Sequence, residues 1–282
     1  MDVFYEYFSE YFDGDKKTIK LLCFRKYHED FIGFNAINIE KDIHPFLQPI
    51  FSVSRSKMIG CEVLVRLRTN DGLVSPGAYI EELERSELLN RVTEKLLGDV
   101  TDFFSDDNLT LPSGFYISFN ICASQLSSQY MINSLLAFNR KLCGKASMVL
   151  ELVERGTLNF DEPTTKALTR LYNEGIFMAI DDFGAGSSSI KYIANVCFST
   201  IKIDKELTSL LDNKLAYQRT IEAIVIFSSK LGLSVTAEGV ESSLQLKLLS
   251  NIGVDAAQGY YLAKPMGFSE FYTEYLHENL NL

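Results

Sequence analysis

From about residue 44 onward, short apolar segments with strand character alternate with segments that have helical periodicity. The strand-like segments are residues 46–53, 58–68, 115–121, 148–153, 176–180, 200–203, 234–237 and 256–262. Strands that alternate with helices of about 10–15 residues are typical of a parallel sheet. Eight such units in about 235 residues fit a closed barrel better than an open sheet.

The connection between the first two predicted strands implies one exception to a fully parallel barrel. Only a short polar turn lies between residues 53 and 58, and parallel strands need a much longer crossover. The first strand is therefore expected to run antiparallel to its neighbour. The sequence predicts an α/β fold, a modified (β/α)8 TIM-type barrel with an antiparallel first strand. Helices are expected at 79–105 (as one or two), 123–141, 161–174, 187–195, 215–231, 242–251 and 269–279.

Residues 1–42 differ in character from the rest of the chain, and we treat them as an N-terminal extension to a barrel domain of residues 43–282. Five aromatic residues fall at helical spacing ahead of a glycine that can end a helix, namely Phe4, Tyr7, Phe8, Tyr11 and Phe12. This stripe predicts a helix that packs its aromatic side on the main domain. A partner-binding or sensory appendage is the alternative. The interleaved Glu6 and Glu10 argue against binding to a membrane surface.

The composition limits the partners and the compartment. The 282 residues include 27 Lys and Arg but 37 Asp and Glu, for a net charge of −10, which disfavours polymeric nucleic acid and anionic membranes as partners. The five cysteines have no C-x-x-C spacing, which is typical of reduced thiols in the cytosol. We find no apolar run of about 18 residues and no secretion leader, so we expect a soluble, cytoplasmic protein without a membrane span.

Any hydrolytic metal in this chain is expected to be held by oxygen atoms. The three histidines, His28, His44 and His277, lie far apart and form no H-E-x-x-H or H-x-x-x-H pattern. Their spacing disfavours a zinc site and a Ser-His-Asp triad. Oxygen ligands favour Mg²⁺ or Mn²⁺ instead.

Polar side chains gather at the ends or on the inward faces of the predicted strands. They are Glu62, Asn120, Glu151, Asp181, Asp182, Lys202, Asp204, Glu238 and Gln258. Any one of them alone could be a solvated loop residue, and the two adjacent aspartates alone could form a turn that satisfies its own backbone. Barrel enzymes, however, carry their active sites at the C-terminal ends of the strands. Carboxylates that converge there protonate or recruit cations, and a pair of divalent ions is typical of enzymes that cleave phosphate esters.

Seven motifs, in order along the chain, resemble those of the EAL-domain family, which are bacterial phosphodiesterases that linearise cyclic di-GMP. The motifs are Glu62-Val-Leu-Val-Arg66, Asn120, Glu151-Leu-Val-Glu154, Asp181-Asp-Phe-Gly-Ala-Gly186, Lys202-Ile-Asp204, Glu238-Gly-Val-Glu241 and Gln258-Gly259. The resemblance covers roughly residues 46–266, and Ser75-Pro76 with Tyr79 is similar to a further family segment. The family's modified barrel, with its antiparallel first strand, agrees with the fold predicted from the strand pattern.

The resemblance implies a role for each matching residue. The ligands of two divalent cations, Mg²⁺ or Mn²⁺, would be Glu62, Asn120, Glu151, Asp181, Asp182 and Glu238. The catalytic group would be Lys202, Glu62, Asp182, Glu238 and Gln258, in which Lys202 orients or helps to deprotonate the attacking water. Cyclic di-GMP would contact Gln48, Arg66 and Asp204. Glu154 and Glu241 would brace loops, and the loop after Asp182 would take part in a homodimer.

Three residues depart from the family pattern, namely Val63, Leu67 and Ser187. Val63 points away from Glu62 by strand alternation, whereas Ser187 bears on the ordering of the loop after the two aspartates. The resemblance implies a metal-dependent phosphodiesterase that converts cyclic di-GMP to linear pGpG. The alternative is a catalytically weak or inactive receptor or protein-interaction module on the same barrel. A protein kinase, suggested by Asp182-Phe-Gly184, is excluded because the chain lacks H-R-D and G-x-G-x-x-G elements.

Overall fold

The computed structural model describes residues 7–13, 16–22, 38–70, 72–84, 86, 88–153, 162–184 and 198–277. The chain divides into two compact units, one of Met1–Pro45 with Val65–Asp99 and the other of Phe46–Leu64 with Val100–Leu282. Strands β3 (Ile43–Ser52) and β4 (Lys57–Thr69) contribute residues to both units. The predicted domain boundary at residue 42 is not tested by this division and stays a prediction.

Eight strands close into a barrel. After β3 and β4 these are β6 (Tyr116–Ile121), β7 (Ser147–Val153), β8 (Phe177–Phe183), β9 (Phe198–Ile203), β12 (Ser234–Ala237) and β13 (Ala256–Ala257). They pair in the order β3-β13-β12-β9-β8-β7-β6-β4, and a further β3–β4 pairing closes the ring. From β4 to β13 the neighbours run parallel, whereas β3 pairs antiparallel with β13. The predicted barrel with an antiparallel first strand is confirmed.

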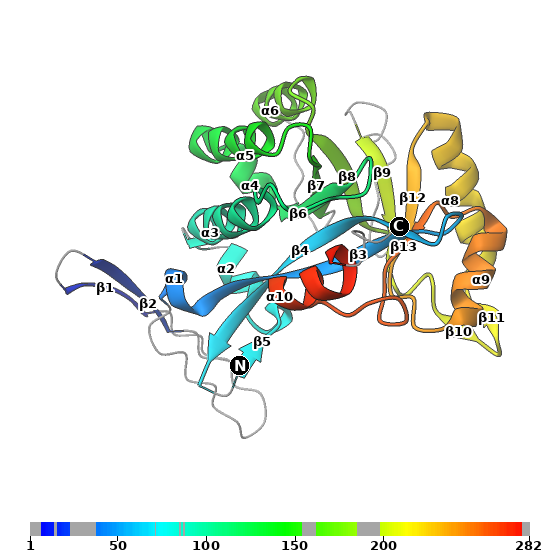
Figure 1. The fold of residues 1–282 in the computed structure, drawn as a ribbon, viewed down its shortest axis with the longest axis horizontal. Helices are drawn as coiled ribbons and strands as arrows, with labels where there is room; N and C mark the ends of the chain where they lie inside the picture. Colours follow the sequence, from blue (N-terminus) through cyan, green and yellow to red (C-terminus); the bar gives the residue numbers. More distant parts are fainter. Residues whose placement is uncertain are drawn as a thin grey trace, which may run out of the picture. The chain divides into compact units, whose positions relative to one another are not determined.

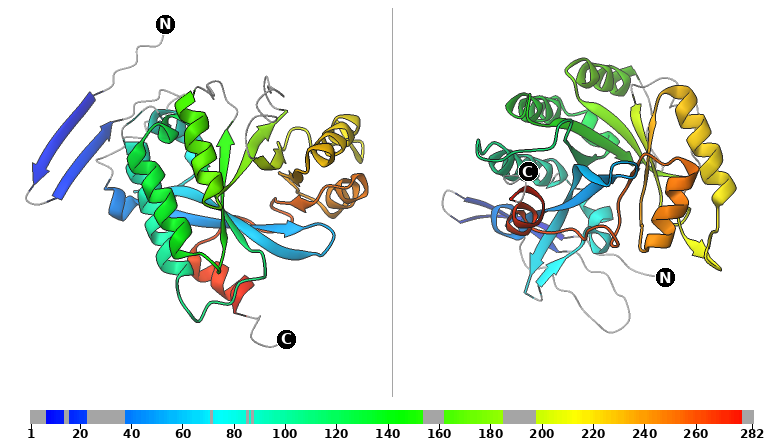
Figure 2. Two further views of the ribbon diagram at one scale, coloured as in Figure 1. Left: turned by 90° about the horizontal axis from the view of Figure 1, so that it is seen from above. Right: turned by 45° about the vertical axis from the view of Figure 1, so that its right-hand side comes forward.

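Helices cover the outside of these strands (Figure 1; Figure 2 gives two further views). They are α4 (Ala123–Leu126), α5 (Gln129–Lys141), α6 (Glu162–Asn173), α8 (Gln218–Leu231), α9 (Ser243–Ile252), α10 (Phe268–Phe271) and the π-helical turn η2 (Tyr272–Leu276). Helix α9 begins where the Ser242 hydroxyl accepts from the backbone N–H of Gln245, and α8 ends at Gly232 in the left-handed conformation. The predicted helix at 187–195 lies outside the described residues.

Strand alternation places polar residues inside the barrel and apolar residues between the strands and the helices. On β6, Ile117 and Phe119 are buried, and the Phe119 ring packs edge-on against Phe138 of α5 with ring centroids 5.0 Å apart. Their neighbours Ser118 and Asn120 therefore point to the opposite face, the barrel interior. Burial of the outer face supplies most of the hydrophobic stabilisation, so the interior can carry polar chemistry.

A small hairpin ahead of α8 was not predicted. Strands β10 (Leu210–Leu211) and β11 (Lys214–Leu215) pair antiparallel across two residues. Those two residues, Asp212 and Asn213, have φ values of 51° and 60°, which is the pattern of the type I′ turn that favours such hairpins. The helix expected at 215–231 consequently starts at Gln218.

The unit that contains the N-terminal residues corrects one prediction. Residues expected to form a helix instead form strand β1 (Tyr7–Asp13), which pairs antiparallel with β2 (Lys16–Leu22). Phe and Tyr favour strands, and the Gly14-Asp15 pair between this aromatic segment and the Thr- and Ile-containing segment of β2 is a hairpin signal that the helical spacing obscured. In the same unit, β5 (Gly72–Val74) pairs antiparallel with the end of β4, and α1 (Ile39–Asp42), η1 (Pro76–Ala78) and α2 (Ile80–Glu84) are its short helical elements.

The helical region predicted at 79–105 forms two helices, α2 and α3 (Leu88–Phe104). Among the described residues, no helix combines the length and apolar character needed to cross a membrane.

Candidate active site

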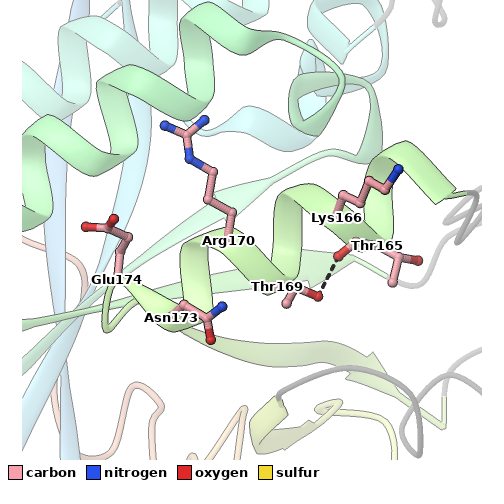
Figure 3. Close-up of a pocket in the computed structure, with 6 residues that line it drawn as sticks. All are labelled: Thr165, Lys166, Thr169, Arg170, Asn173 and Glu174. Carbon is pink, nitrogen blue, oxygen red and sulfur yellow. Dashed lines mark hydrogen bonds between the residues drawn. The ribbon is translucent and has the colours of Figure 1, made fainter.

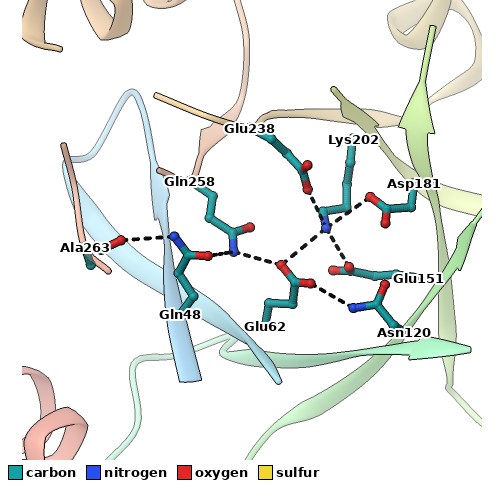
Figure 4. A network of polar contacts seen from close by, with 9 residues as sticks. All are labelled: Gln48, Glu62, Asn120, Glu151, Asp181, Lys202, Glu238, Gln258 and Ala263. Atoms are coloured by element: carbon teal, nitrogen blue, oxygen red, sulfur yellow. Dashed lines mark hydrogen bonds and ion pairs between the residues drawn. The ribbon is translucent and has the colours of Figure 1, made fainter. Parts of the chain in front are cut away.

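The ammonium group of Lys202 lies among carboxylates from four other strands or strand ends (Figure 4). Its Nζ atom is 2.5 Å from Glu151 Oε2, 2.6 Å from Glu238 Oε1, 3.3 Å from Asp181 Oδ1 and 3.5 Å from Glu62 Oε2. The Lys202 side chain is only 3% exposed and that of Glu151 only 2%. Four of these residues lie at or near the C-terminal ends of their strands, which is where barrel enzymes carry their active sites, whereas Glu62 lies in the middle of the longer strand β4.

A chain of amide side chains fixes the orientation of Glu62. Asn120 donates from Nδ2 to Glu62 Oε1 over 2.8 Å, and Gln258 donates from Nε2 to Glu62 Oε2 over 2.8 Å. The same Gln258 amide lies 2.9 Å from Oε1 of Gln48, whose own Nε2 donates to the carbonyl of Ala263 over 3.0 Å. The structure thus brings Gln48, Asn120 and Gln258 into one network with the carboxylates.

A bulge in β8 places two adjacent aspartates at this site. Ile180 pairs with Ile201 and Phe183 with Ile203, so three residue steps on β8 match two on β9. One extra residue breaks the usual alternation, and Asp182 adopts a left-handed φ of 52°. Regular alternation would place two neighbouring aspartates on opposite faces of the strand, and the bulge lets them converge within β8.

The charges of the cluster shift the pKa values in directions set by burial and by neighbours. Burial raises the pKa of Glu151 well above its usual range and that of Glu238 to about 8. The neighbouring carboxylates add to both increases, and Lys202 opposes them. Burial also acts to raise the pKa of Glu62, but Lys202 and the two amide donors lower it on balance. Burial works against the Lys202 ammonium, yet the four carboxylates hold its pKa well above the ordinary value.

The oxygen atoms of the site suit a hard divalent cation. Asp181, Asp182 and Glu238 each offer a carboxylate oxygen, and these oxygens lie within 4.8 Å of one another. The buried acceptor Gln258 Oε1 has no hydrogen-bond partner within the part of the chain that the structure describes, and Asp181 Oδ1 is contacted there only through its ion pair with Lys202. Buried acceptors are rarely left without a donor, and such oxygens are the ligands that Mg²⁺ and Mn²⁺ prefer. The residues therefore fit the cation that the sequence implied.

The other predicted site residues either have no recorded contact with the carboxylate cluster or lie outside the described residues. Asp204 is buried and its Oδ1 accepts from the backbone N–H of Glu206 over 2.8 Å, as in a turn cap. Arg66 belongs to the other compact unit, where its Nη1 donates to the carbonyl of Val65. Glu241 is exposed next to the start of α9. Glu154, like Ser187, lies outside the described residues. The predicted roles of Asp204, Arg66, Glu241 and Glu154 stay predictions.

Two buried polar residues next to Glu238, Thr208 and Gln245, were missed by the sequence reasoning. The signal for Gln245 was available, because Ser242-x-x-Gln245 before an apolar run matches a capping box. No comparable signal marks Thr208, whose hydroxyl contacts the carbonyl of Lys205 in its own turn and, at a shorter distance, that of Glu238 in a different loop.

A pocket of about 470 Å³ lies away from this chemistry, along the surface of α6 (Figure 3). Its lining residues are Thr165, Lys166, Thr169, Arg170, Asn173 and Glu174. These belong to α6 or to the turn directly after it, so the pocket does not touch the carboxylate cluster.

Comparisons with known proteins agree with this geometry. The probable cyclic di-GMP phosphodiesterase PdeG of Escherichia coli strain K12 is 33% identical over 235 residues, which are 83% of this chain but only 46% of PdeG. The cyclic di-GMP phosphodiesterase PdeL of the same organism is 28% identical over 280 residues, covering 98% of this chain and 77% of PdeL. The chain thus spans less than half the length of the first relative.

Solved structures of EAL-domain proteins and cyclic di-GMP phosphodiesterases are also similar to this chain. The EAL enzyme Bd1971, in a form bound to cAMP and cyclic di-GMP, matches with a TM-score of 0.75 and 25% identity over 83% of this chain and 64% of its own. The PaMucR phosphodiesterase in complex with c-di-GMP matches with a TM-score of 0.70 and 26% identity over 82% of this chain and all of that one. The EAL domain family model matches residues 35–265, and the chain therefore belongs to the EAL domain family.

Proposed function

We propose that this chain is a metal-dependent phosphodiesterase that hydrolyses cyclic di-GMP to linear pGpG. The observation that carries the proposal is the convergence of Glu62, Glu151, Asp181 and Glu238 on Lys202 at one end of the barrel. So many buried carboxylates are costly unless they hold cations. The names of PdeG and PdeL, and the ligand in the PaMucR structure, indicate cyclic di-GMP as the substrate.

The metal ligands in this proposal are Glu62, Asn120, Glu151, Asp181, Asp182 and Glu238. Two bound divalent ions, Mg²⁺ or Mn²⁺, would lower the pKa of a water molecule and neutralise charge on the phosphate. Hydrolysis joins the water oxygen to phosphorus and breaks one bond from phosphorus to a ribose oxygen, which takes up a proton. One cycle of this reaction opens the ring and gives pGpG.

The chain's own residues then have distinct tasks. Lys202 is protonated in the metal-free site because four carboxylates raise its pKa, so it starts as a hydrogen-bond donor that can orient a water molecule. Divalent cations bound in the same pocket would lower the pKa of Lys202 and so favour its neutral form. Only the neutral amine can accept a proton from the attacking water. Gln258 offers its buried Oε1 as an acceptor. Gln48, Arg66 and Asp204 remain our proposed contacts to the dinucleotide.

The test is product formation by the purified chain. Cyclic di-GMP is incubated with Mg²⁺ or Mn²⁺, with and without EDTA, and pGpG is measured by chromatography. Glu151→Gln and Asp181→Asn are expected to lower the rate by about 10²–10³-fold, because each removes a carboxylate that we propose as a metal ligand. The matched control is Glu162→Gln, an exposed carboxylate on α6, which should leave the rate unchanged. Turnover by Asp181→Asn at the parental rate would contradict the proposal.

A receptor without turnover is the second candidate, and one observation favours it. Lys202 already neutralises part of the cluster through contacts of 2.5 and 2.6 Å to Glu151 and Glu238, so the pocket can exist without metal. A receptor would bind cyclic di-GMP in calorimetry and yield no pGpG in the product assay. We further propose a cytoplasmic homodimer, for which the measurement is the molar mass from light scattering.

A further inference from the structure

The backbone of Glu238 is held by the segment after β9. Its N–H donates to the carbonyl of Ile203 over 3.1 Å, and its own carbonyl accepts from Thr208 Oγ1 over 2.6 Å. Ile203 ends β9 and Thr208 lies in the turn after it. Both backbone polar groups of this carboxylate residue therefore depend on one neighbouring segment rather than on the helix that comes after Glu238 in the chain.

Gln245 connects the same segment to the loop that carries Glu238. The side chain is buried, and its Nε2 donates to the carbonyl of Thr208 over 2.8 Å and to that of Gly239 over 3.1 Å. Its Oε1 accepts from the backbone N–H of Glu241 over 2.9 Å. One amide thus joins the turn after β9 to both sides of the bend after β12. Each of these polar groups is satisfied by another, so the loss of one leaves a buried partner without its bond.

The two loops also touch directly. Gly239 has a left-handed φ of +63°, and a Cβ atom there would overlap Cβ of Lys205. Because there is no space between the loops, movement of the turn after β9 must move the bend that carries Glu238.

We propose that Thr208 and Gln245 are positioning residues that hold the Glu238 carboxylate where it meets the oxygens of Asp181 and Asp182. The inference rests on the proposed function in one respect, namely that these three carboxylates bind a divalent cation. Groups that orient metal ligands without touching the metal commonly change metal affinity by about 10–100-fold. Thr208 and Gln245 are expected to change metal affinity in this way, because they hold the main chain of the loop that carries Glu238.

The experiment measures Mn²⁺ binding to the metal-free chain by titration calorimetry, without substrate. Thr208→Val removes the hydroxyl at nearly constant volume, and Thr208→Ser restores it. Thr208→Val and Gln245→Met are expected to weaken Mn²⁺ binding by about 10-fold, and Thr208→Ser to stay near the parent. The control is Ser228→Ala, which also deletes a buried hydroxyl that donates to a backbone carbonyl, that of Ile224 over 2.8 Å within α8.

Steady-state kinetics separates positioning from simple loss of fold. For Thr208→Val, kcat should fall at limiting Mn²⁺ and recover at saturating Mn²⁺, while KM for cyclic di-GMP stays unchanged. Equal Mn²⁺ affinities of Thr208→Val, Thr208→Ser and the parent would overturn the inference, as would an equal loss in Ser228→Ala. A parent that binds Mn²⁺ but forms no pGpG contradicts the proposed function, while the affinity comparison still decides the positioning role.

Discussion

Replacement of Lys202 by methionine tests the electrostatic description of the site most directly. Methionine keeps much of the length and apolar volume of the side chain but removes the ammonium that lies within 3.5 Å of four carboxylates. Removal of one partner from a buried ion pair typically costs about 3–5 kcal/mol. The side chains of Glu151 and Glu62 are 2% and 9% exposed, so water can do little to replace the ammonium there. Asp181 and Glu238 are 13% and 21% exposed and can be hydrated in part.

The loss should depend on pH in a defined direction. The folded-state pKa of Lys202 is raised, so its contribution is complete below the unfolded value of about 10.4 and does not change between pH 5 and 8. Glu151 and Glu238 also have raised pKa values, near 8 for Glu238. Lys202 lowers the pKa values of Glu62, Glu151 and Glu238, so its removal raises all three further. The folded variant therefore gains more protons, and more stability, than the parent as the pH falls from 8 towards 5. We expect a loss of about 3–5 kcal/mol at pH 8 and a clearly smaller one at pH 5.

The assay is urea unfolding in EDTA and again with Mn²⁺. Mn²⁺ at 100 times its Kd adds about 2.7 kcal/mol to the free energy of unfolding, and Lys202→Met should gain more than the parent at the same concentration because no ammonium competes for the carboxylates. The matched control is Lys166→Met, which removes an exposed pair with Glu162 and should change stability by less than about 0.5 kcal/mol. A Lys202→Met variant as stable as the parent at pH 8 in EDTA, or an equal loss at pH 5 and pH 8, would refute the reasoning.

Three further outcomes are expected. Apparent Mn²⁺ affinity should rise with pH by up to about 10-fold per unit until near pH 8, because Glu238 must lose a proton to bind metal; calorimetry between pH 6 and 9 checks this. Gly239→Ala should destabilise the fold by at least about 1 kcal/mol, because Gly239 has a left-handed φ and contacts the neighbouring loop. Gly98→Ala, in open space on α3, should instead stabilise the fold by about 0.5–1 kcal/mol. The midpoints of urea unfolding measure both changes. Iodoacetamide should label exposed Cys143 much faster than Cys61, whose burial raises its thiol pKa, as read by peptide mass spectrometry.

Most of the barrel could be predicted because its signals are local. Runs of apolar residues identify the strands, and the short turn between 53 and 58 is enough to predict the antiparallel first strand. The strands also end in the polar residues that meet at the site, which is why Glu62, Glu151 and Glu238 could be grouped before their distances were known. The N-terminal hairpin could not be distinguished in the same way, because the spacing of Tyr7, Phe8 and Tyr11 suits a helix as well as a strand.

Contacts that depend on the register between distant segments could not be predicted from the sequence. Thr208 reaches the carbonyl of Glu238, thirty positions away, and nothing in its own neighbourhood marks it as different from a surface threonine. The pairing of Gln258 with Glu62 spans a still longer separation. Such contacts form only when the barrel closes and brings distant segments together. The periodicity of a single segment carries no information about them.

The bulge in β8 is the feature that converts this barrel end into a cation site. With regular alternation, Asp181 would face the interior and Asp182 the helices, and the group of three carboxylate oxygens within 4.8 Å would lose a member. The extra residue turns Asp182 inward at the cost of a left-handed φ, a strain of about 1–3 kcal/mol that persists only where surrounding structure enforces it. Pairing with β9 resumes at Phe183 opposite Ile203, one position after Lys202. The strand pairing that enforces the strained backbone therefore also sets Lys202 beside Asp181, and the positions of the aspartates and of the ammonium are determined together.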